Sequence, residues 1–291
     1  MWKKHRNWLT PVLFIVPGCI LFGTIIIASS MESIWISFFD WDGVGQKTWV
    51  GLANYFELFA DPQFYVSLKN NIIWLVMFMA APPLGLALAL LVNQQIAGMR
   101  ILKSLFFIPL VLATVTVGVV FGWVYDPNYG LLALIFSLFG AAAPALLADE
   151  HFVTFAVVIA ALWPQIAFCM VLFLAGLNNL SSDIIGAGRV DGARGWNMLW
   201  HVVLPQLRQV GFIALAVTVV GALRSFDMIA VMTSGGPFGS SEVLAYQMYE
   251  QSIFSYRFGY GAAIATILFV IMIIFITWYL RVMVRMERET R

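Results

Sequence analysis

The chain has 291 residues, of which 62% are hydrophobic and only 11% are charged. A soluble globular domain is about 45–50% apolar, so this composition, with a mean hydropathy of +0.90, excludes an ordinary soluble protein. The formal net charge of +1 identifies no class of partner, because the distribution of the charges carries the information. We therefore predict an all-α, polytopic membrane protein with a single domain over residues 1–291.

Six segments are apolar and long enough to cross a bilayer, which takes roughly 20 mostly apolar residues per helix. They are about residues 11–38, 69–93, 104–125, 152–178, 206–234 and 259–284. The first is long and lacks a small-residue cleavage site, so we expect it to be retained as an anchor. Residues 128–150 are too short to cross twice and too apolar for a free loop, which predicts a helix at the periplasmic membrane interface.

The basic residues predict the orientation in the membrane. Most of the 16 lysines and arginines fall at the N-terminus, in two loops or in the C-terminal tail. These residues are Lys3, Lys4, Arg6, Arg100, Lys103, Arg189, Arg194, Arg208, Arg281, Arg285, Arg288 and Arg291. By the positive-inside rule, both termini and these loops are cytoplasmic. The opposite loops are acidic and aromatic, and two interpretations stay open: a solvated periplasmic surface, or a docking surface for a soluble binding protein.

The polar interval 180–205 lies between two apolar segments and predicts a short helix–turn–helix on the cytoplasmic membrane surface. Residues 181–183 (S-S-D) offer side chains for a helix N-cap, and Asp191-Gly192 supplies a turn. A second apolar helix is expected to begin at Leu204-Pro205, because proline is tolerated in a first turn. We expect a partner protein to bind this interval.

Within the interval, Gly186-Ala187-Gly188, the core R-V-D-G-A at 189–193 and V-V-L-P at 202–205 have a recognisable spacing. They resemble the EAA loop of binding-protein-dependent ABC importer permeases. The chain departs from the family at Gly186, where the family has Glu, and at Gly188, where it has a second Ala. The resemblance implies contacts with a partner ATPase, carried by Asp183, Ala187, Arg189, Asp191, Gly192, Ala193, Arg194 and Trp196.

Further segments look like those of the carbohydrate-type permeases. They are V-G-L-A-N-Y at 50–55 with D-P at 61–62, L-A-G-L at 174–177, and F-D at 226–227 with T-S-G-G-P at 233–237. The resemblance implies a type I ABC importer subunit of the bacterial inner membrane that moves a sugar or sugar-like solute. It also implies a second related permease, two ATPase subunits and a periplasmic or lipid-anchored solute-binding protein as partners.

Three polar residues within the apolar spans are candidates for the translocation path: Gln165, Arg224 and Asp227. Gln165 either forms an interhelical hydrogen bond or faces the path. Arg224 and Asp227 are spaced i, i+3, so either they neutralise each other on one helical face, or Arg224 reaches a water-filled cavity. In the second case, Arg224 would contact the solute and favour an anionic or heavily hydroxylated molecule.

No catalytic constellation is visible. A P-loop needs glycine before its lysine, and none of the lysines follows a glycine, so we expect ATP and Mg to be bound by partner subunits. His5, His151 and His201 are scattered, which predicts no metal site, and we expect no cofactor in this chain. The alternatives are a secondary transporter driven by an ion gradient, in which a membrane carboxylate would handle the ion, and a scaffold protein without a solute.

Overall fold

The computed structural model describes residues 2–94, 96 and 98–289, so Arg291 lies outside the described residues. The described chain is mainly helical and forms two compact units, which do not follow the sequence order. The first unit comprises the chain up to Pro62 together with Gln247–Val270, and the second comprises Gln63–Tyr246 together with the chain from Ile271 onward. Because helix α16 (Phe258–Glu289) continues from one unit into the other, the prediction of a single domain stays a prediction.

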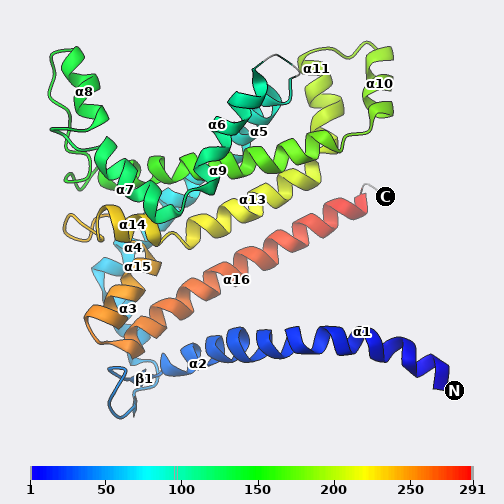
Figure 1. Cartoon of the computed structure of the whole chain (residues 1–291). Coiled ribbons are helices and arrows are strands. Elements are labelled where there is room, and N and C mark those ends of the chain that lie inside the picture. The colour runs from blue at the N-terminus through cyan, green and yellow to red at the C-terminus, as the bar shows by residue number, and fades with distance from the viewer. Residues whose placement is uncertain (1, 95, 97, 290–291) are drawn as a thin grey trace. The chain divides into compact units, whose positions relative to one another are not determined.

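The first unit begins with a long continuous helical run that ends in a small β-hairpin (Figure 1). Its elements are α1 (Trp2–Leu21), η1, a π-helix (Phe22–Ala28), α2 (Ser29–Ile36), β1 (Phe39–Asp40), β2 (Thr48–Trp49), α3 (Ala53–Ala60), η3, a second π-helix (Glu250–Phe254), and the first part of α16. The two strands pair antiparallel, with Phe39 opposite Trp49.

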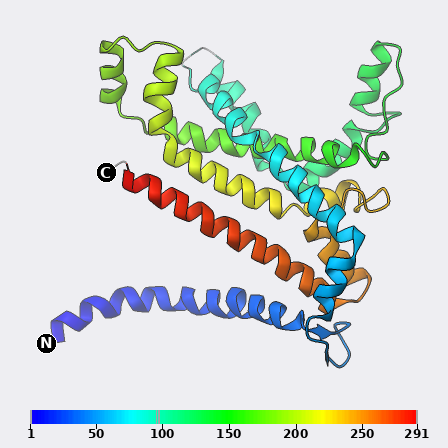
Figure 2. The ribbon, with the colours of Figure 1, turned by 180° about the vertical axis from the view of Figure 1, so that it is seen from behind.

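The second unit holds most of the described helices and a hydrophobic core cluster. Its elements are α4 (Pro62–Phe78), α5 (Ala81–Val92), α6 (Met99–Val111), α7 (Thr114–Val124), α8 (Leu131–Leu138), α9 (Val153–Asn178), α10 (Ser182–Val190), α11 (Trp196–Met198), η2, a π-helix (Leu199–Val203), α12 (Leu204–Gln206), α13 (Arg208–Leu223), α14 (Asp227–Met232) and the start of α15 (Leu244–Tyr249). Figures 1 and 2 show α10 and α11 beyond one end of α9 and α13, with α7 and α8 near the other end of α9.

Among the described residues, four helices are long and apolar enough to cross a membrane, and there are up to six if each of two bent pairs forms one span. The four are Pro11–Ile36, Pro62–Val92, Val153–Asn178 and Phe258–Arg285. The bent pairs are Met99–Val111 with Thr114–Val124, and Trp196–Gln206 with Arg208–Leu223. These segments overlap all six predicted spans.

Besides the two-residue turn between α4 and α5, two of the predicted spans are strongly bent or interrupted. The third bends by 104° between α6 and α7, because Leu112 and Ala113 adopt extended backbone conformations. In the fifth, α13 ends at Leu223 and helix resumes only at Asp227. Hydropathy along the sequence shows neither interruption. The residues at the first break are as apolar as their neighbours, and the second break is only three residues long.

The core of the second unit depends on small residues where α5 crosses α9. Ala81, Gly85 and Ala89 recur every four residues on one face of α5, and both alanines are completely buried. A Cβ atom on Gly85 would lie 2.5 Å from Cβ of Cys169 and 2.8 Å from the backbone nitrogen of Met170. Small residues at this spacing let two membrane helices approach closely. The neighbouring Pro82 and Pro83 lie in the first turn of α5, where proline is tolerated.

In the first unit, a buried asparagine joins α3 to the chain segment that follows α2. The Nδ2 atom of Asn54 donates hydrogen bonds to the carbonyl oxygens of Ser37, at 2.8 Å, and Phe39, at 2.9 Å. The hydroxyls of Tyr55 and Ser37 lie 2.6 Å apart. Gly51 has a φ of +60°, a backbone conformation that favours glycine. The G-L-x-N-Y stretch therefore has a structural role in this unit.

Replacing Gly85 by alanine should destabilise the protein, because the added methyl group meets backbone atoms of α9 that cannot move aside. Overpacking of this kind costs about 1–3 kcal/mol, so we expect the Gly85→Ala variant to unfold at a lower temperature in detergent. Gly122→Ala is the matched control, since a Cβ atom there meets nothing within 4 Å. Equal melting temperatures for the two variants would contradict the close α5–α9 packing.

Candidate functional site

The predicted coupling segment forms a helical hairpin whose turn is closed by backbone hydrogen bonds. Helix α10 ends with Asp191 as its C-cap, and Gly192 follows with a φ of +85°. The N–H of Ala193 donates to the carbonyl of Gly188 at 2.8 Å, and the N–H of Gly192 donates to that of Arg189 at 3.1 Å. This is the Schellman arrangement, which satisfies the last carbonyls of a helix. The turn predicted at Asp191-Gly192 is confirmed, with glycine in the position that requires a positive φ.

The second helix of the hairpin begins earlier than predicted. It starts at Trp196 and runs through the π-helix η2 to Gln206, whereas the sequence placed its start at Leu204-Pro205. The start is fixed by Gly195, whose backbone conformation (φ +53°, ψ −123°) favours glycine. Trp196 therefore belongs to the second helix. Ser181 is the N-cap of α10, but its side chain makes no capping hydrogen bond.

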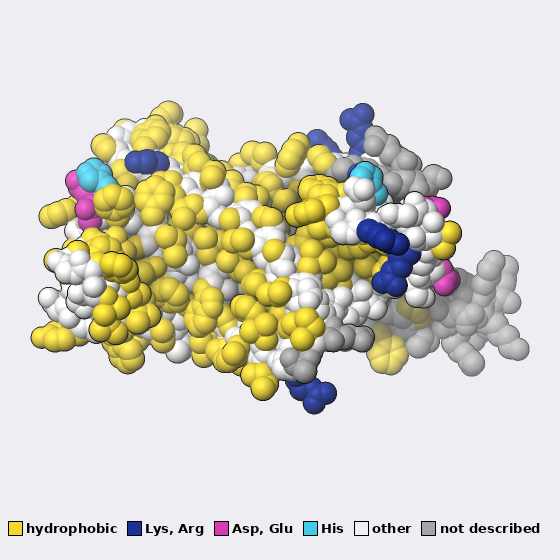
Figure 3. Space-filling view, turned by 90° about the horizontal axis from the view of Figure 1, so that it is seen from above, with side chains coloured by type: hydrophobic (Ala, Val, Ile, Leu, Met, Phe, Trp, Pro, Cys, Tyr) yellow, Lys and Arg dark blue, Asp and Glu magenta, His cyan; other side chains and the backbone are white. Residues whose placement is uncertain are grey.

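The coupling residues predicted from the resemblance lie on the surface of this hairpin. All of them are exposed except Ala193, which is half-buried. Apolar side chains accompany them: Val190 is 88% exposed and Trp196 is 71% exposed, and the rings of Trp196 and Trp200 stack with centroids 6.5 Å apart. In Figure 3, most of the visible lysine and arginine side chains gather toward one end of the face. The hairpin thus offers a mixed apolar and charged surface to a partner protein, with Arg189 and Arg194 beside Asp183 and Asp191.

The two glycines that depart from the EAA pattern have different surroundings. A Cβ atom on Gly186 would meet nothing within 4 Å, so this position has room for a side chain. A Cβ atom on Gly188 would lie 2.9 Å from Cγ2 of Val202, across the hairpin. Gly188 is also the buried residue of α10. Glycine at position 188, where the family has alanine, therefore permits close packing within the hairpin. Glycine at position 186, where the family has glutamate, is not required by packing.

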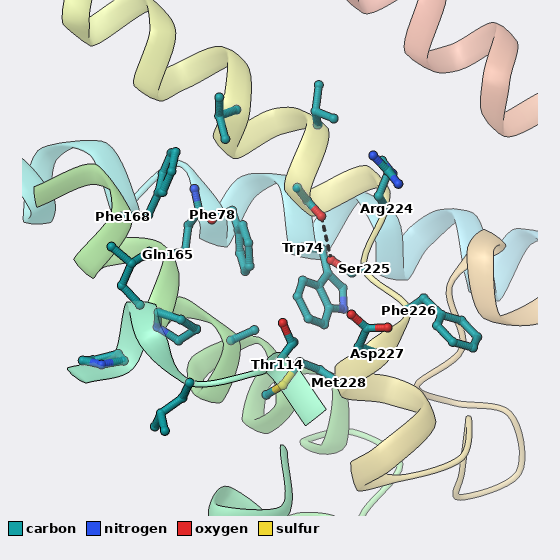
Figure 4. Close-up of a pocket in the computed structure, with 18 of the residues that line it drawn as sticks. Trp74, Phe78, Thr114, Gln165, Phe168, Arg224, Ser225, Phe226, Asp227 and Met228 are labelled. Carbon is teal, nitrogen blue, oxygen red and sulfur yellow. Dashed lines mark hydrogen bonds between the residues drawn. The ribbon is translucent and has the colours of Figure 1, made fainter. Parts of the chain in front are cut away.

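A cavity of about 790 Å³ lies in the second unit, and all three predicted path residues line it. Its walls come from α4, α6, α7, α9, α13, α14 and one residue of α16. Gln165 enters from α9, while Arg224 and Asp227 flank the break between α13 and α14 (Figure 4). The structure thus brings together three polar residues that are separated by up to 62 positions in the sequence.

Arg224 and Asp227 do not neutralise each other. No ion pair joins them in the part of the chain that the structure describes, and both side chains are exposed. The prediction that Arg224 and Asp227 pair at i, i+3 required a continuous helix. Instead, Arg224 is the C-cap of α13 and Asp227 is the first residue of α14. Figure 4 shows the two side chains directed apart, with Asp227 toward Trp74. The predicted neutralised pair is therefore wrong.

Two roles were considered for Gln165, an interhelical hydrogen bond and a position on the translocation path. The structure shows the hydrogen bond, and Gln165 also lines the cavity. Its Nε2 atom donates to Oγ1 of Thr218 on α13 at 2.9 Å. Thr218 and the neighbouring Cys169 are completely buried. The amide therefore links α9 to α13 beside the cavity, where a buried polar group needs a partner.

Buried amides on α4 hold the loop that follows α14. The Nδ2 atom of Asn70 donates to the carbonyl oxygens of Ser240 and Glu242, each at 2.7 Å. The Oδ1 atom of Asn71 accepts the backbone N–H of Leu244 at 2.9 Å. Thr154 on α9 donates to the same Ser240 carbonyl at 3.2 Å. We call these contacts the loop clamp; they attach the loop after α14 to α4 and α9.

Sequence reasoning missed the loop clamp and Trp74, which also lines the cavity. A signal for the clamp was present, because Asn70-Asn71 is an adjacent polar pair within an apolar span. Polar residues at such positions are expensive to bury and usually have a partner or a function. Trp74 gave no signal, because tryptophan is common in membrane spans and the sequence does not show what its ring nitrogen faces.

These features define a class: a multi-span membrane transport subunit, with an internal cavity and an exposed hairpin joined to two of the cavity's walls. Residues 81–288 match the family model described as the binding-protein-dependent transport system inner membrane component, and the chain belongs to this family. The predicted resemblance to ABC importer permeases and the predicted permease fold are thereby confirmed. Family membership also decides against a secondary transporter driven by an ion gradient.

Individual relatives agree over nearly the whole chain. A probable ABC transporter permease of Pyrococcus horikoshii is 33% identical over 92% of this chain and 94% of its own length. The trehalose/maltose transport system permease MalF of Thermococcus litoralis is 31% identical over 96% of this chain and 95% of its own length. A chain of a bacterial ABC transporter for import of the acidic polysaccharide alginate has the same fold, with a TM-score of 0.85, 19% identity and 98% coverage of both chains.

Removing the amide of Asn70 should loosen the loop clamp. The Asn70→Ala variant removes the amide donor of the Glu242 carbonyl and leaves the Ser240 carbonyl with Thr154 as its side-chain donor. An unsatisfied buried polar group costs about 1–3 kcal/mol. We expect a clear fall in the melting temperature of the detergent-purified protein. Asn179→Ala serves as the control, because Asn179 is exposed and donates only to Ala175 within its own helix. A loss no larger than that of the control would rule out the clamp.

Proposed function

We propose that this chain is the translocation subunit of an ABC importer that carries a sugar or sugar-like solute into the cytoplasm. Two observations support the solute class: the similarity to a trehalose/maltose permease, and the similarity to relatives named as sn-glycerol-3-phosphate permeases in Brucella. The cavity lined by Gln165, Arg224 and Asp227 is the proposed path of the solute. The chain itself catalyses no reaction in this proposal.

One connection carries the proposal: the exposed hairpin lies between two helices that both form walls of the cavity. Helix α9, which contributes Gln165, leads into α10, and the second helix of the hairpin leads into α13, which contributes Gly221. A force on the hairpin therefore acts directly on two walls. If partner ATPases close on ATP, the attached walls can convert that movement into alternating access of the cavity.

The proposed assembly contains a second related permease, two ATPase subunits that bind ATP and Mg, and a periplasmic or lipid-anchored binding protein. In support, a further solved structure with the same fold comes from an alginate ABC transporter in complex with a periplasmic protein. The proposed orientation in the inner membrane places both termini and the hairpin in the cytoplasm. It rests on the distribution of basic residues between the loops.

The decisive functional experiment is uptake by proteoliposomes that contain the assembled complex. We expect uptake of maltose or trehalose when ATP is enclosed with the ATPase subunits and the binding protein is on the other side. A proton or sodium gradient without ATP should drive none. Uptake that follows an ion gradient and ignores ATP would contradict the proposed mechanism.

Cysteine cross-linking tests the hairpin contact in a variant that lacks Cys19 and Cys169. Ala187 is exposed on α10, so Ala187→Cys should cross-link to an ATPase subunit and react with an impermeant thiol reagent only from the cytoplasmic side. Ala141→Cys is the matched control, because Ala141 is equally classed as exposed but lies beyond α8. Periplasmic labelling of residue 187, or cross-links from residue 141 alone, would overturn the assignment.

A further inference from the structure

Helix α8 presents an apolar face that the described protein does not cover. Four of its residues recur at i, i+3, i+4 and i+7, which places them on one side of the helix. All four are exposed, and we call them the α8 stripe: Leu131, Leu134, Ile135 and Leu138. Leu134 is 60% exposed and Leu138 is 77% exposed. A contiguous exposed apolar patch marks a contact with a partner or with a membrane.

The connection to α7 holds α8 at the end of a candidate membrane span. Oδ1 of Asp126 accepts the backbone N–H groups of Asn128 and Tyr129, each at 2.8 Å. The N–H of Gly130 donates to the carbonyl of Asp126 at 3.0 Å. Both views of the ribbon show α8 running across the direction of α9 (Figures 1 and 2). A helix that runs across the spans at their end lies along the membrane surface.

The residues around α8 are those of a lipid interface. Residues 127–148 contain no charged side chain. Trp123, near the end of α7, is 72% exposed, and Tyr129, just before α8, is 95% exposed. Tryptophan and tyrosine are enriched where a membrane meets water. A protein interface has a polar rim and about one hydrogen bond per 100–200 Å², whereas the α8 stripe has no polar side chain. These observations favour lipid over a protein partner.

An apolar groove leads from this level into the span. Its volume is about 490 Å³, and it is lined by Val120, Phe121, Val124, Ile159, Leu162, Trp163 and Ile166, none of which lines the cavity. The hydroxyl of Tyr125 donates to the carbonyl of Ala156 at 3.1 Å, which joins α7 to α9 at the end nearest α8. The groove therefore starts beside α8 and runs along α9 toward the middle of the span. Its lining offers a hydrocarbon chain contacts on several sides and a sugar hydroxyl almost no partner.

We propose that α8 and this groove form a binding site for one phospholipid of the leaflet farther from the hairpin. One acyl chain lies in the groove between α7 and α9, and the α8 stripe inserts between acyl chains just below the headgroups. The leaflet follows from the fold, because the hairpin continues from the C-terminal end of α9 and α8 lies near its N-terminal end. Since α7 and α9 also line the cavity, the bound lipid braces two of its walls. The site does not depend on which solute the importer carries.

Retention of a brominated lipid tests the groove, because bromine on an acyl chain quenches only an indole ring that it touches. The assembled complex is reconstituted in vesicles of dibrominated phosphatidylglycerol and phosphatidylcholine and then transferred to detergent, which removes freely exchanging lipid. We expect part of the tryptophan fluorescence to stay quenched, and the Trp163→Phe variant to lack this retained quenching. Trp123→Phe is the matched control, because Trp123 is exposed but does not line the groove. Retained quenching that survives in Trp163→Phe, or its absence from the wild type, would reject the site.

Filling the groove provides a second measurement, native mass spectrometry of the complex purified in detergent. Val120→Trp places a large ring where the acyl chain would lie, so we expect the fraction with bound phospholipid to fall about tenfold. Val115→Trp is the control, since Val115 is 51% exposed on the same helix and lies outside the groove. Ile159→Ser should also lower the fraction, and because Ile159 is exposed it does so without overpacking. Unchanged lipid occupancy in Ile159→Ser, with no greater loss in Val120→Trp than in the control, rules out the groove.

The depth of α8 separates a lipid surface from a protein partner. In a variant that lacks Cys19 and Cys169, a spin label attached through Leu134→Cys should collide with oxygen, which concentrates in lipid, rather than with a water-soluble nickel chelate. A label at Glu150→Cys is the control, because Glu150 is exposed beyond the uncharged segment and should meet the chelate. Access of the chelate to residue 134 would show that the stripe faces water. Protection of that residue from both reagents would show a protein partner, and either result overturns the lipid contact.

Discussion

The break at Arg224–Phe226 is the constraint on which the arrangement of the cavity depends. Within a membrane, non-helical backbone is tolerated only where it is buried in protein or lines a water-filled cavity. Here the interrupted segment lines the cavity, and local bonds limit its cost: the N–H of Arg224 donates to Val220, and the hydroxyl of Ser225 donates to Gly221 at 3.1 Å. The interruption makes Asp227 the start of a new helix and frees it from the face of α13. The loop clamp holds Ser240 and Glu242 in the loop that follows this short helix.

The hairpin and the cavity are connected directly, because α9 and α13 flank the hairpin and line the cavity. Helix α9 runs unbroken for 26 residues, and its part beyond Phe168 connects the cavity to the hairpin. The hydrogen bond between Gln165 and Thr218 ties α9 to α13 beside the cavity. Further along, the hydroxyl of Tyr279 donates to the carbonyl of Phe212 at 2.6 Å, which ties the end of α16 to α13. Buried polar contacts of this kind give helices a defined register, which apolar contacts alone specify weakly.

The sequence predicted the features that depend on local chemistry. Hydropathy located the membrane segments, and Asp191-Gly192 marked a turn because few residues besides glycine accept its positive φ. It did not predict features that depend on distant packing. The i, i+3 spacing of Arg224 and Asp227 suggested a pair only under the assumption of a continuous helix. The start of the second hairpin helix was placed too late because Pro205 marks a first turn, whereas a π-helix precedes it in the same helical run. The unpaired nitrogen of Trp74 could not be inferred, since it depends on side chains from other helices.

The two glycines of the hairpin show how a departure from a family pattern can be interpreted physically. At Gly188 the fold itself explains the residue, because a methyl group would press against Val202 and separate the two helices. At Gly186 none of the described contacts requires glycine, and each glycine inside a helix costs about 1 kcal/mol relative to alanine. Gly186 is exposed and lowers helix stability, and none of the described packing contacts offsets this cost. Packing within the chain therefore accounts for glycine at position 188 and not at position 186.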